Sequence, residues 1–413
     1  MTRAAVQPAP GATRVSDNAE AFLAEAARRE PTLRAFTSID AERLRREAVA
    51  LDELPVQERG PLFGSLIAVK EVFDVAGYVC GWGSPIHANR IPDKDAAVVE
   101  ALRAAGALIA GITVSTEYAM AATGPTTNPH DPLRTPGASS QGSGAAVGAG
   151  LVPAALGSQT IGSIVRPAAY CGIVGFKPTW GLIDDRGAMP LSQPIDHPGF
   201  VATDPDIAER ILGVLAPRYT PSALPKKAVI LRPWYEEATA EHITDQINIA
   251  AEKLRQSGVE VTEASIPDGI ADFEAEVLDT ILSVGMAKNI GDDYDTASDR
   301  MSPRIRDYVI RGRNCSSAEY DRALACQHSY ARMLDDLLHG AVALAPATVD
   351  IAPLLSDGTG SRAPQRLWTL AGLPAASVPF GSHAGMPIGI QVIGPRQRDA
   401  DVMAAVRTLC PAT

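Results

Sequence analysis

The chain of 413 residues has few aromatic side chains and no excess of positive charge. Phe, Trp and Tyr together make up 5% of it, and the formal net charge at pH 7 is −11. Because Lys and Arg are scattered along the sequence, no basic surface is predicted that could follow a phosphate backbone, and nucleic acid is not an expected partner. Hydrophobic residues still reach 46%, so the sequence predicts a globular protein with a large core.

Long apolar runs are also absent. The segment closest to one, 144–157, consists largely of Gly and Ala and is interrupted by Pro153, so no membrane span is predicted. Residues 1–22 lack the apolar segment of a secretory signal, and residues 1–14 are expected to form a flexible N-terminus. These features indicate a cytoplasmic protein without a membrane partner.

Paired cysteines are a third missing feature. The five cysteines stand far apart and form no CxxC pair. We therefore expect unpaired and mostly buried thiols in a reducing compartment.

Short apolar runs alternate with amphipathic segments along the chain. Strands are predicted at 64–75, 107–114, 228–233, 342–347, 374–380 and 388–394. Helices are predicted at 17–30, 41–54, 95–106, 205–215, 238–257, 317–339 and 400–409. This order predicts an α/β fold, a single large domain whose mixed, mostly parallel β-sheet core is covered by helices on both faces.

The stretch between Arg134 and Arg166 contains no charged residue, yet it is rich in serine and glycine. A serine hydroxyl needs a nearby base to act as a nucleophile. None of the seven histidines lies in a recognisable motif, no serine lies in a GxSxG elbow, and the P-loop interpretation fails because Ser143 stands where Lys is required.

Lysine is the remaining candidate for the base. Lys70 lies in an apolar run beside Val69, where burial would lower its pKa and make it a proton acceptor. A second serine can relay a proton, since a hydroxyl both donates and accepts. Neighbouring glycines would let backbone amides converge into an oxyanion hole.

Several segments carry a family resemblance: GSLIAVKEVFDVAG at 64–77, GASSQGS at 137–143, GSQTIGSIVRPA at 157–168, and GLPAASVPFG with GMPIGIQVIG at 372–394. They resemble the amidase signature family of serine hydrolases over roughly residues 15–410. The spacing agrees as well, because Ser163 follows Ser139 by 24 residues.

The resemblance implies a catalytic role for three side chains. Ser163 matches the acyl-forming nucleophile, Ser139 the bridging serine whose preceding peptide bond is cis, and Lys70 the base. The backbone N–H groups that match the oxyanion hole belong to Thr160, Ile161, Gly162 and Ser163. No metal or cofactor is expected, and the resemblance assigns no substrate-binding residue.

The resemblance also implies how the chain is organised. It makes 1–413 one amidase signature domain, with a signature core at 60–205, a variable helical region at 206–340 and the C-terminal part of the core at 341–413. Four positions depart from the family pattern: Ala138 replaces a usual Gly, Gln159 a common Asp, Ile161 a smaller residue, and Glu71 a common Asp.

Other polar residues in these segments are expected to be structural. We expect Ser140 and Ser143 to cap a helix that starts near Gly142, and Arg166 to fix its turn through hydrogen bonds. The polar stretch 354–365 is expected to form a flexible loop over a site.

The expected function is hydrolysis of the amide bond of a small carboxamide or ureido-type substrate through a serine acyl-enzyme. The first alternative is a glutamine-hydrolysing amidotransferase subunit that works with a partner protein. The second is a non-catalytic scaffold with the same fold. A homodimer and a complex with a small partner subunit both stay open as assemblies.

Overall fold

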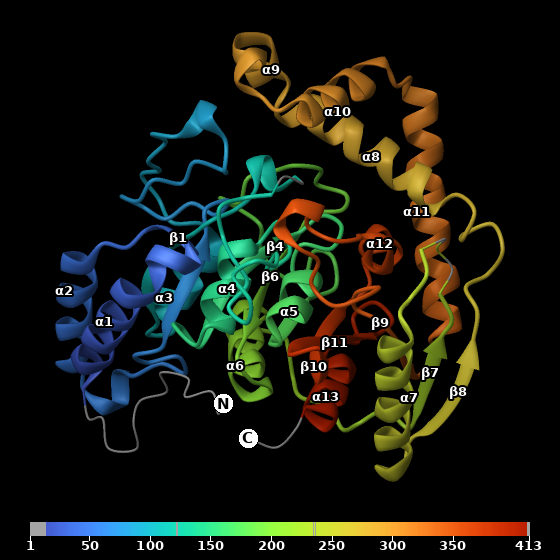
Figure 1. Ribbon diagram of the computed structural model, residues 1–413, viewed down its shortest axis with the longest axis horizontal. Coiled ribbons are helices and arrows are strands. Elements are labelled where there is room, and N and C mark those ends of the chain that lie inside the picture. Colours follow the sequence, from blue (N-terminus) through green and yellow to red (C-terminus); the bar gives the residue numbers. More distant parts are fainter. Residues whose placement is uncertain (1–13, 121–122, 234, 236, 411–413) are drawn as a thin grey trace.

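A computed structural model describes residues 14–120, 123–233, 235 and 237–410, so the expected flexible N-terminus lies outside the described residues except for Arg14. The strands of this part of the chain form one 11-stranded sheet in the order β1-β3-β2-β4-β6-β5-β10-β11-β9-β7-β8 (Figure 1). Their bounds are β1 Phe36–Ser38, β2 Leu66–Lys70, β3 Leu108–Thr113, β4 Ala154–Gln159, β5 Val174–Lys177, β6 His197–Ala202, β7 Lys227–Leu231, β8 Glu260–Ala264, β9 Ala341–Pro346, β10 Ala375–His383 and β11 Met386–Ile393. One sheet thus includes all the predicted strand segments.

The sheet is mixed, as predicted, but the expectation that it is mostly parallel is wrong. Parallel pairing joins β2 to β3 and β4, and β7 to β8 and β9. The other six neighbouring pairs of described strands are antiparallel. The reason is that β10 and β11 are joined by a tight turn rather than a helix, and β6 runs antiparallel between β4 and β5.

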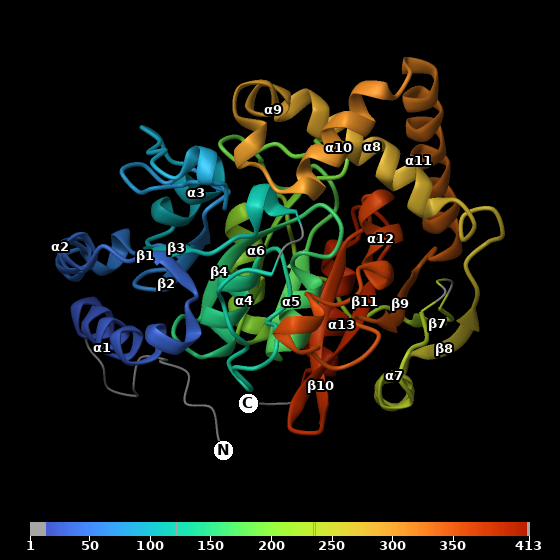
Figure 2. The same cartoon turned by 45° about the horizontal axis from the view of Figure 1, so that its top comes forward.

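Helices cover both faces of this sheet, as predicted (Figures 1 and 2). They are α1 Val15–Leu33, α2 Ala41–Asp52, α3 Ala97–Ala104, α4 Gln141–Gly148, α5 Val165–Cys171, α6 Pro205–Leu215, α7 Glu241–Gln256, α8 Glu274–Asn289, α9 Gly291–Ala297, α10 Pro303–Asn314, α11 Ser317–Leu337, α12 Ala363–Leu370 and α13 Asp399–Leu409.

Side chains of β2 show how the two faces are covered. Leu66 and Ala68 belong to a core cluster that includes residues of α1, α2 and α4. Ile67 and Val69 belong to the other large cluster, which includes residues of α3 and α6. Successive residues of a strand point to opposite faces, so both faces of β2 are buried. This explains the unbroken apolar sequence of the strand.

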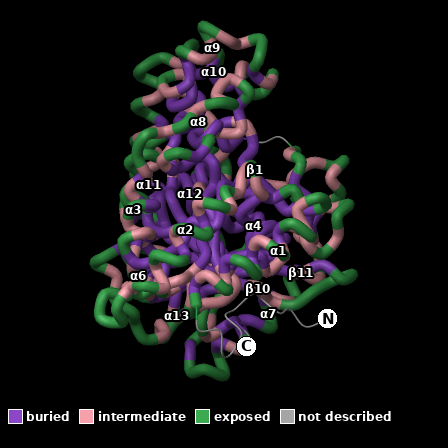
Figure 3. Tube along the Cα trace, turned by 90° about the vertical axis from the view of Figure 1, so that its left-hand side faces the viewer, coloured by how far each residue is buried: buried purple, intermediate pink, exposed green. Residues whose placement is uncertain are grey.

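Helices α8, α9 and α10 form an arm that lies above the middle of the sheet in Figure 1, with α11 beside it. The buried interior continues from the sheet into this arm (Figure 3). The region 206–340, expected to be helical, also contains the parallel strands β7 and β8, which extend one edge of the sheet.

The cysteines agree with the sequence prediction. None of the five forms a disulfide in the described structure, and Cys80, Cys171 and Cys410 are buried while the other two are partly exposed. Within the described residues, no helix is both long and apolar enough to cross a membrane.

Candidate active site

Lys70 is the last residue of β2 and is fully buried. Its Nζ donates to Ser139 Oγ at 2.7 Å and to Ser158 Oγ at 2.8 Å. Burial lowers the pKa of Lys70 to about 7, while the carboxylates of Glu71 and Asp196 act in the opposite direction. A large fraction of this amine is therefore neutral near pH 7, and a neutral amine can accept the proton of a hydroxyl at the same distance.

Ser139 stands just before α4 and is held by bonds to its backbone. The Ala138–Ser139 peptide bond is cis, as the resemblance implies. Ser139 O accepts from Thr116 N at 3.4 Å, and Ala138 O accepts from Arg166 Nη2 at 2.7 Å. The side chain of Ser139 is thereby fixed toward the lysine.

Ser163 lies in the turn between β4 and α5. Its backbone O accepts from Ser140 N at 3.3 Å, which joins this turn to the segment of Ser139. No hydrogen bond links Ser163 Oγ to another described residue, and the side chain lines the same cavity as Ser139. The structure thus forms the contact between Lys70 and Ser139 and places Ser163 beside it, without a bond between the two serines. Such contacts often tighten only when substrate is bound.

The turn at 160–163 presents unused backbone donors. Within the described part of the chain, the N–H groups of Thr160, Ile161, Gly162 and Ser163 donate to no protein acceptor. Buried N–H groups without a partner are uncommon, so this turn is prepared to bind an acceptor from outside the chain.

Gln159, one of the departures from the family pattern, braces this turn. Its Oε1 accepts from Ile164 N at 2.8 Å and Val165 N at 3.1 Å, and its Nε2 donates to Thr369 Oγ1 at 2.9 Å. Thr369 Oγ1 in turn donates to Ile161 O at 2.6 Å. An acceptor and a donor are both needed here, and the amide of Gln159 supplies both.

Asp196 holds the other side of the turn. Its Oδ1 accepts from Thr160 Oγ1 at 2.6 Å, and its Oδ2 accepts from the backbone N–H groups of Leu191 and Ser192. Burial raises the pKa of this carboxyl group, whereas these hydrogen bonds act to lower it. Asp196 therefore fixes Thr160 through one oxygen and the 191–192 segment through the other.

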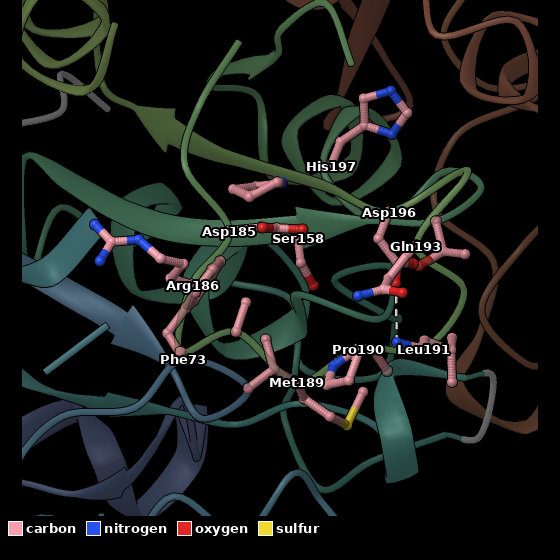
Figure 4. A pocket seen from close by; sticks show the side chains of 16 residues that line it. Phe73, Ser158, Asp185, Arg186, Met189, Pro190, Leu191, Gln193, Asp196 and His197 are labelled. Carbon is pink, nitrogen blue, oxygen red and sulfur yellow. Dashed lines mark hydrogen bonds between the residues drawn. The ribbon is translucent and has the colours of Figure 1, made fainter. Parts of the chain in front are cut away.

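Two cavities meet at these residues. The smaller holds about 270 Å³, part of it open to solvent, and its lining residues include both serines, Ile161, Arg166 and Arg362. The larger holds about 800 Å³, part of it open to solvent, and Ser158 and Asp196 line it (Figure 4). Ala119 and Thr160 belong to both walls, so the cavities adjoin at the catalytic candidates.

Two interpretations of neighbouring serines are wrong. Ser140 precedes α4 but its side chain does not cap this helix: its Oγ donates to Ser158 O at 3.3 Å. Ser143 Oγ donates to Leu156 O at 2.8 Å. Because the carbonyls of β4 lie against α4, these hydroxyls bind the strand instead of the helix end.

The expectation for Arg166 is confirmed. Its guanidinium donates to the backbone carbonyls of Ala138 in one segment and of Gly360 and Ser361 in another.

Sequence reasoning missed Ser158 and Thr369. Ser158 meets Lys70 because β2 and β4 are parallel neighbours, with Val69 opposite Leu156. The order of strands in the sheet is not visible in the sequence. Thr369 comes from α12, more than 200 residues away from the turn that it braces.

Comparisons with known proteins agree with the fold. The Amidase family model matches residues 17–403. A crystal structure of an amidase is 30% identical with a TM-score of 0.87 over 97% of this chain and 96% of that one. A structure from a complex described as revealing the evolutionary origins of an s-triazine catabolic enzyme is 29% identical, also with a TM-score of 0.87 and the same coverage.

Curated relatives include a glutamyl-tRNA(Gln) amidotransferase subunit from Anaeromyxobacter sp. (strain K), 31% identical over 95% of this chain and 92% of that protein. The fold and these matches define an amidohydrolase, an enzyme that hydrolyses carbon–nitrogen amide bonds. The chain belongs to the Amidase family, which confirms the resemblance to amidase signature enzymes.

Proposed function

We propose that the protein hydrolyses the amide bond of a small carboxamide or ureido-type substrate through an acyl-enzyme on Ser163. The observation that supports this most is the buried amine of Lys70 at 2.7 Å from Ser139 Oγ, beside a cavity that Ser163 lines. A lysine with its pKa near 7 and a hydroxyl partner has the properties of a general base at neutral pH.

In the acylation step, neutral Lys70 accepts the proton of Ser139, and Ser139 accepts the proton of Ser163. The oxygen of Ser163 then attacks the amide carbon. The negative charge that develops on the carbonyl oxygen is bound by the unused N–H groups of the 160–163 turn. Each such donor contributes roughly 3 kcal/mol to the stability of the transition state. The relay next delivers a proton to the leaving nitrogen, and the carbon–nitrogen bond breaks.

Deacylation uses the same groups in the same order. Lys70 accepts a proton from water through Ser139, and the resulting hydroxide attacks the ester of Ser163. The collapse of the tetrahedral intermediate returns the proton to Ser163 and releases a carboxylic acid. Every proton is moved by side chains of this chain.

The test is a comparison of wild type with Ser163→Ala on a panel of small amides, together with labelling by a fluorophosphonate, which reacts with activated serines. Wild type is expected to hydrolyse at least one amide and to be labelled on Ser163. The variant is expected to lose both. Full turnover by Ser163→Ala would end the proposal.

A second candidate function is favoured by the relatives that are named as amidotransferase subunits. In that function the same site would release ammonia from glutamine for a partner protein. Ammonia release from glutamine that depends on the presence of a partner protein would support it. For the third possibility, a non-catalytic scaffold, the distinguishing result is absence of fluorophosphonate labelling in the wild type.

A further inference from the structure

The small cavity at Ser163 carries positive charge only. Its described lining includes two ionisable side chains, Arg166 and Arg362, and no carboxylate. The whole chain has a net charge of −11 at pH 7, so two unopposed guanidinium groups around one small space are unexpected. A third guanidinium, that of Arg304 at the start of α10, is close enough to act on Arg166.

Arg166 builds one wall of this cavity. It is 2% exposed, and its Nη1 donates to Gly360 O at 2.7 Å and to Ser361 O at 3.2 Å. These bonds attach the segment before α12 to the catalytic turn. The Nε of Arg166 is buried without a hydrogen-bond partner in the described structure. A buried donor that lacks a partner is costly unless a ligand supplies the acceptor.

Arg362 follows directly on the segment that Arg166 holds. It is partly buried, and no hydrogen bond or ion pair joins its guanidinium to another described residue. The carboxylate that this segment does engage, Glu237, accepts from Ser361 Oγ at 2.6 Å and is exposed. Arg362 thus stands at the cavity wall with its guanidinium donors unused by the described residues.

We propose that Arg362 binds a carboxylate on the acyl part of the substrate, with the Nε–H of Arg166 as a supporting donor. The substrate class is then the monoamides of small dicarboxylic acids and the corresponding ureido acids. This inference rests on the proposed acyl-enzyme at Ser163 and names its substrate class. A guanidinium suits a carboxylate because it can donate two parallel hydrogen bonds to it.

The size and position of the cavities indicate which part of the substrate is charged. The group that becomes attached to Ser163 must fit the cavity that Ser163 lines, which at about 270 Å³ is the smaller of the two. The leaving group has the adjoining cavity of about 800 Å³, whose lining includes Asp185, Arg186 and Asp196 and therefore offers charges of both signs, unlike the smaller cavity. Negative charge is therefore favoured on the acyl side.

The same charges disfavour glutamine. A free α-amino acid would bring an ammonium group together with its carboxylate into a space lined by two guanidinium groups. The repulsion of like charges is strong in a cavity with little water. The inference therefore predicts a preference for a monoanionic amide over glutamine.

The first test compares dicarboxylic acid monoamides with the neutral diamides of the same chain length. Wild type is expected to favour the monoamide in kcat/KM. In Arg362→Gln this preference should fall by about 10- to 100-fold, the range of a lost charge-assisted hydrogen bond. Arg362→Lys should recover part of it. The matched control is Arg218→Gln, at an exposed arginine that follows α6, which should keep the wild-type preference.

The second test does not depend on finding the substrate. Small dicarboxylates are added as competitors during fluorophosphonate labelling of Ser163. They are expected to slow labelling of the wild type and of Arg218→Gln. In Arg362→Gln, the dicarboxylate concentration that halves the labelling rate should be at least about tenfold higher, the effect of one lost charge-assisted hydrogen bond. The labelling rate without competitor shows that each variant is folded.

The outcomes separate the inference from the proposed function. If Ser163 is labelled and amides are hydrolysed, but the preference and the protection are equal in wild type and Arg362→Gln, the carboxylate site is disproved while the acyl-enzyme stands. If the wild type is not labelled and hydrolyses no amide, the proposed function fails and the inference fails with it.

Discussion

Two lysines, Lys70 and Lys177, lie at the ends of two strands in the interior of the protein, and they have contrasting neighbours. Both are fully buried, and burial lowers the pKa of each to about 7. Lys70 at the end of β2 donates to two hydroxyls, those of Ser139 and Ser158. Lys177 at the end of β5 donates to the carbonyl oxygens of Pro178, at 3.1 Å, and of Leu373.

In the proposed mechanism, this difference separates the base, Lys70, from a lysine with a structural role, Lys177. A hydroxyl can reverse its role and donate to a neutral amine, but a carbonyl can only accept. Lys177 therefore has no proton to receive from these partners, and it lines neither of the two cavities at the site. A lowered pKa marks both lysines, and the chemistry of the partner decides which of them can act in catalysis.

Replacing each lysine by Met in turn should give the largest difference in kcat between two variants. We expect Lys70→Met to lower kcat for amide hydrolysis by about 10⁴-fold, because the relay loses its proton acceptor. Steady-state hydrolysis measures the loss, and circular dichroism checks the fold. Activity of this variant within about tenfold of wild type would mean that another group is the base.

Thr369→Val removes the hydroxyl that binds Gln159 and, in the 160–163 turn, Ile161 O, and it should lower kcat by a smaller factor. We expect kcat to fall by about tenfold with little change in KM, since the proposed oxyanion donors lose a positioning contact and the substrate loses none. The pH at the midpoint of the rate profile should stay in place. Thr408→Val, which removes a hydroxyl bonded within α13, is the matched control and should behave as wild type.

Glu71→Gln should move the pH profile by a small amount. The rate of acylation is expected to rise with pH as Lys70 loses its proton, with a midpoint near its pKa of about 7. The carboxylate of Glu71 favours the charged lysine and raises its pKa, so its removal should move the midpoint to lower pH. A midpoint that stays or moves to higher pH would contradict this assignment.

Lys177→Met should have the smallest effect on activity and a clear effect on stability. We expect kcat within about threefold of wild type, because this lysine does not reach the relay. The free energy of unfolding should fall by about 1–3 kcal/mol, since two buried carbonyls lose their donor. Denaturant titration measures the second quantity. A loss of activity as large as that of Lys70→Met would remove the distinction between the two lysines.

Much of the fold was predictable from apolar runs. The segments around Lys70, at 107–114 and at 205–215 are a strand, a strand and a helix, the last two with nearly the predicted bounds. Two of the missed strands lack that pattern. β8 is an edge strand with polar, largely exposed residues, and β6 contains Pro198 and Gly199 although it lies inside the sheet. Neither matches the composition by which buried strands are recognised.

The candidate site was predictable where its residues are close in sequence or belong to segments that carry the family resemblance. Ser139 and Ser163 lie in one charge-free stretch, and the resemblance connects them to Lys70. Thr369 and Arg362 come from a distant segment, and Ser158 reaches the lysine through the order of strands. The segment 354–365, expected to be a flexible loop over a site, contains a short 3-10 helix and the start of α12, and the sequence did not indicate that its Arg362 lines the cavity.

The most direct test of the central claim, that Lys70 and not Lys177 is the base that activates Ser163, is the pH dependence of fluorophosphonate labelling. The rate should rise through a midpoint near pH 7 in the wild type and in Lys177→Met, and this rise should be absent in Lys70→Met. A rise that survives in Lys70→Met, or that disappears in Lys177→Met, would contradict the claim.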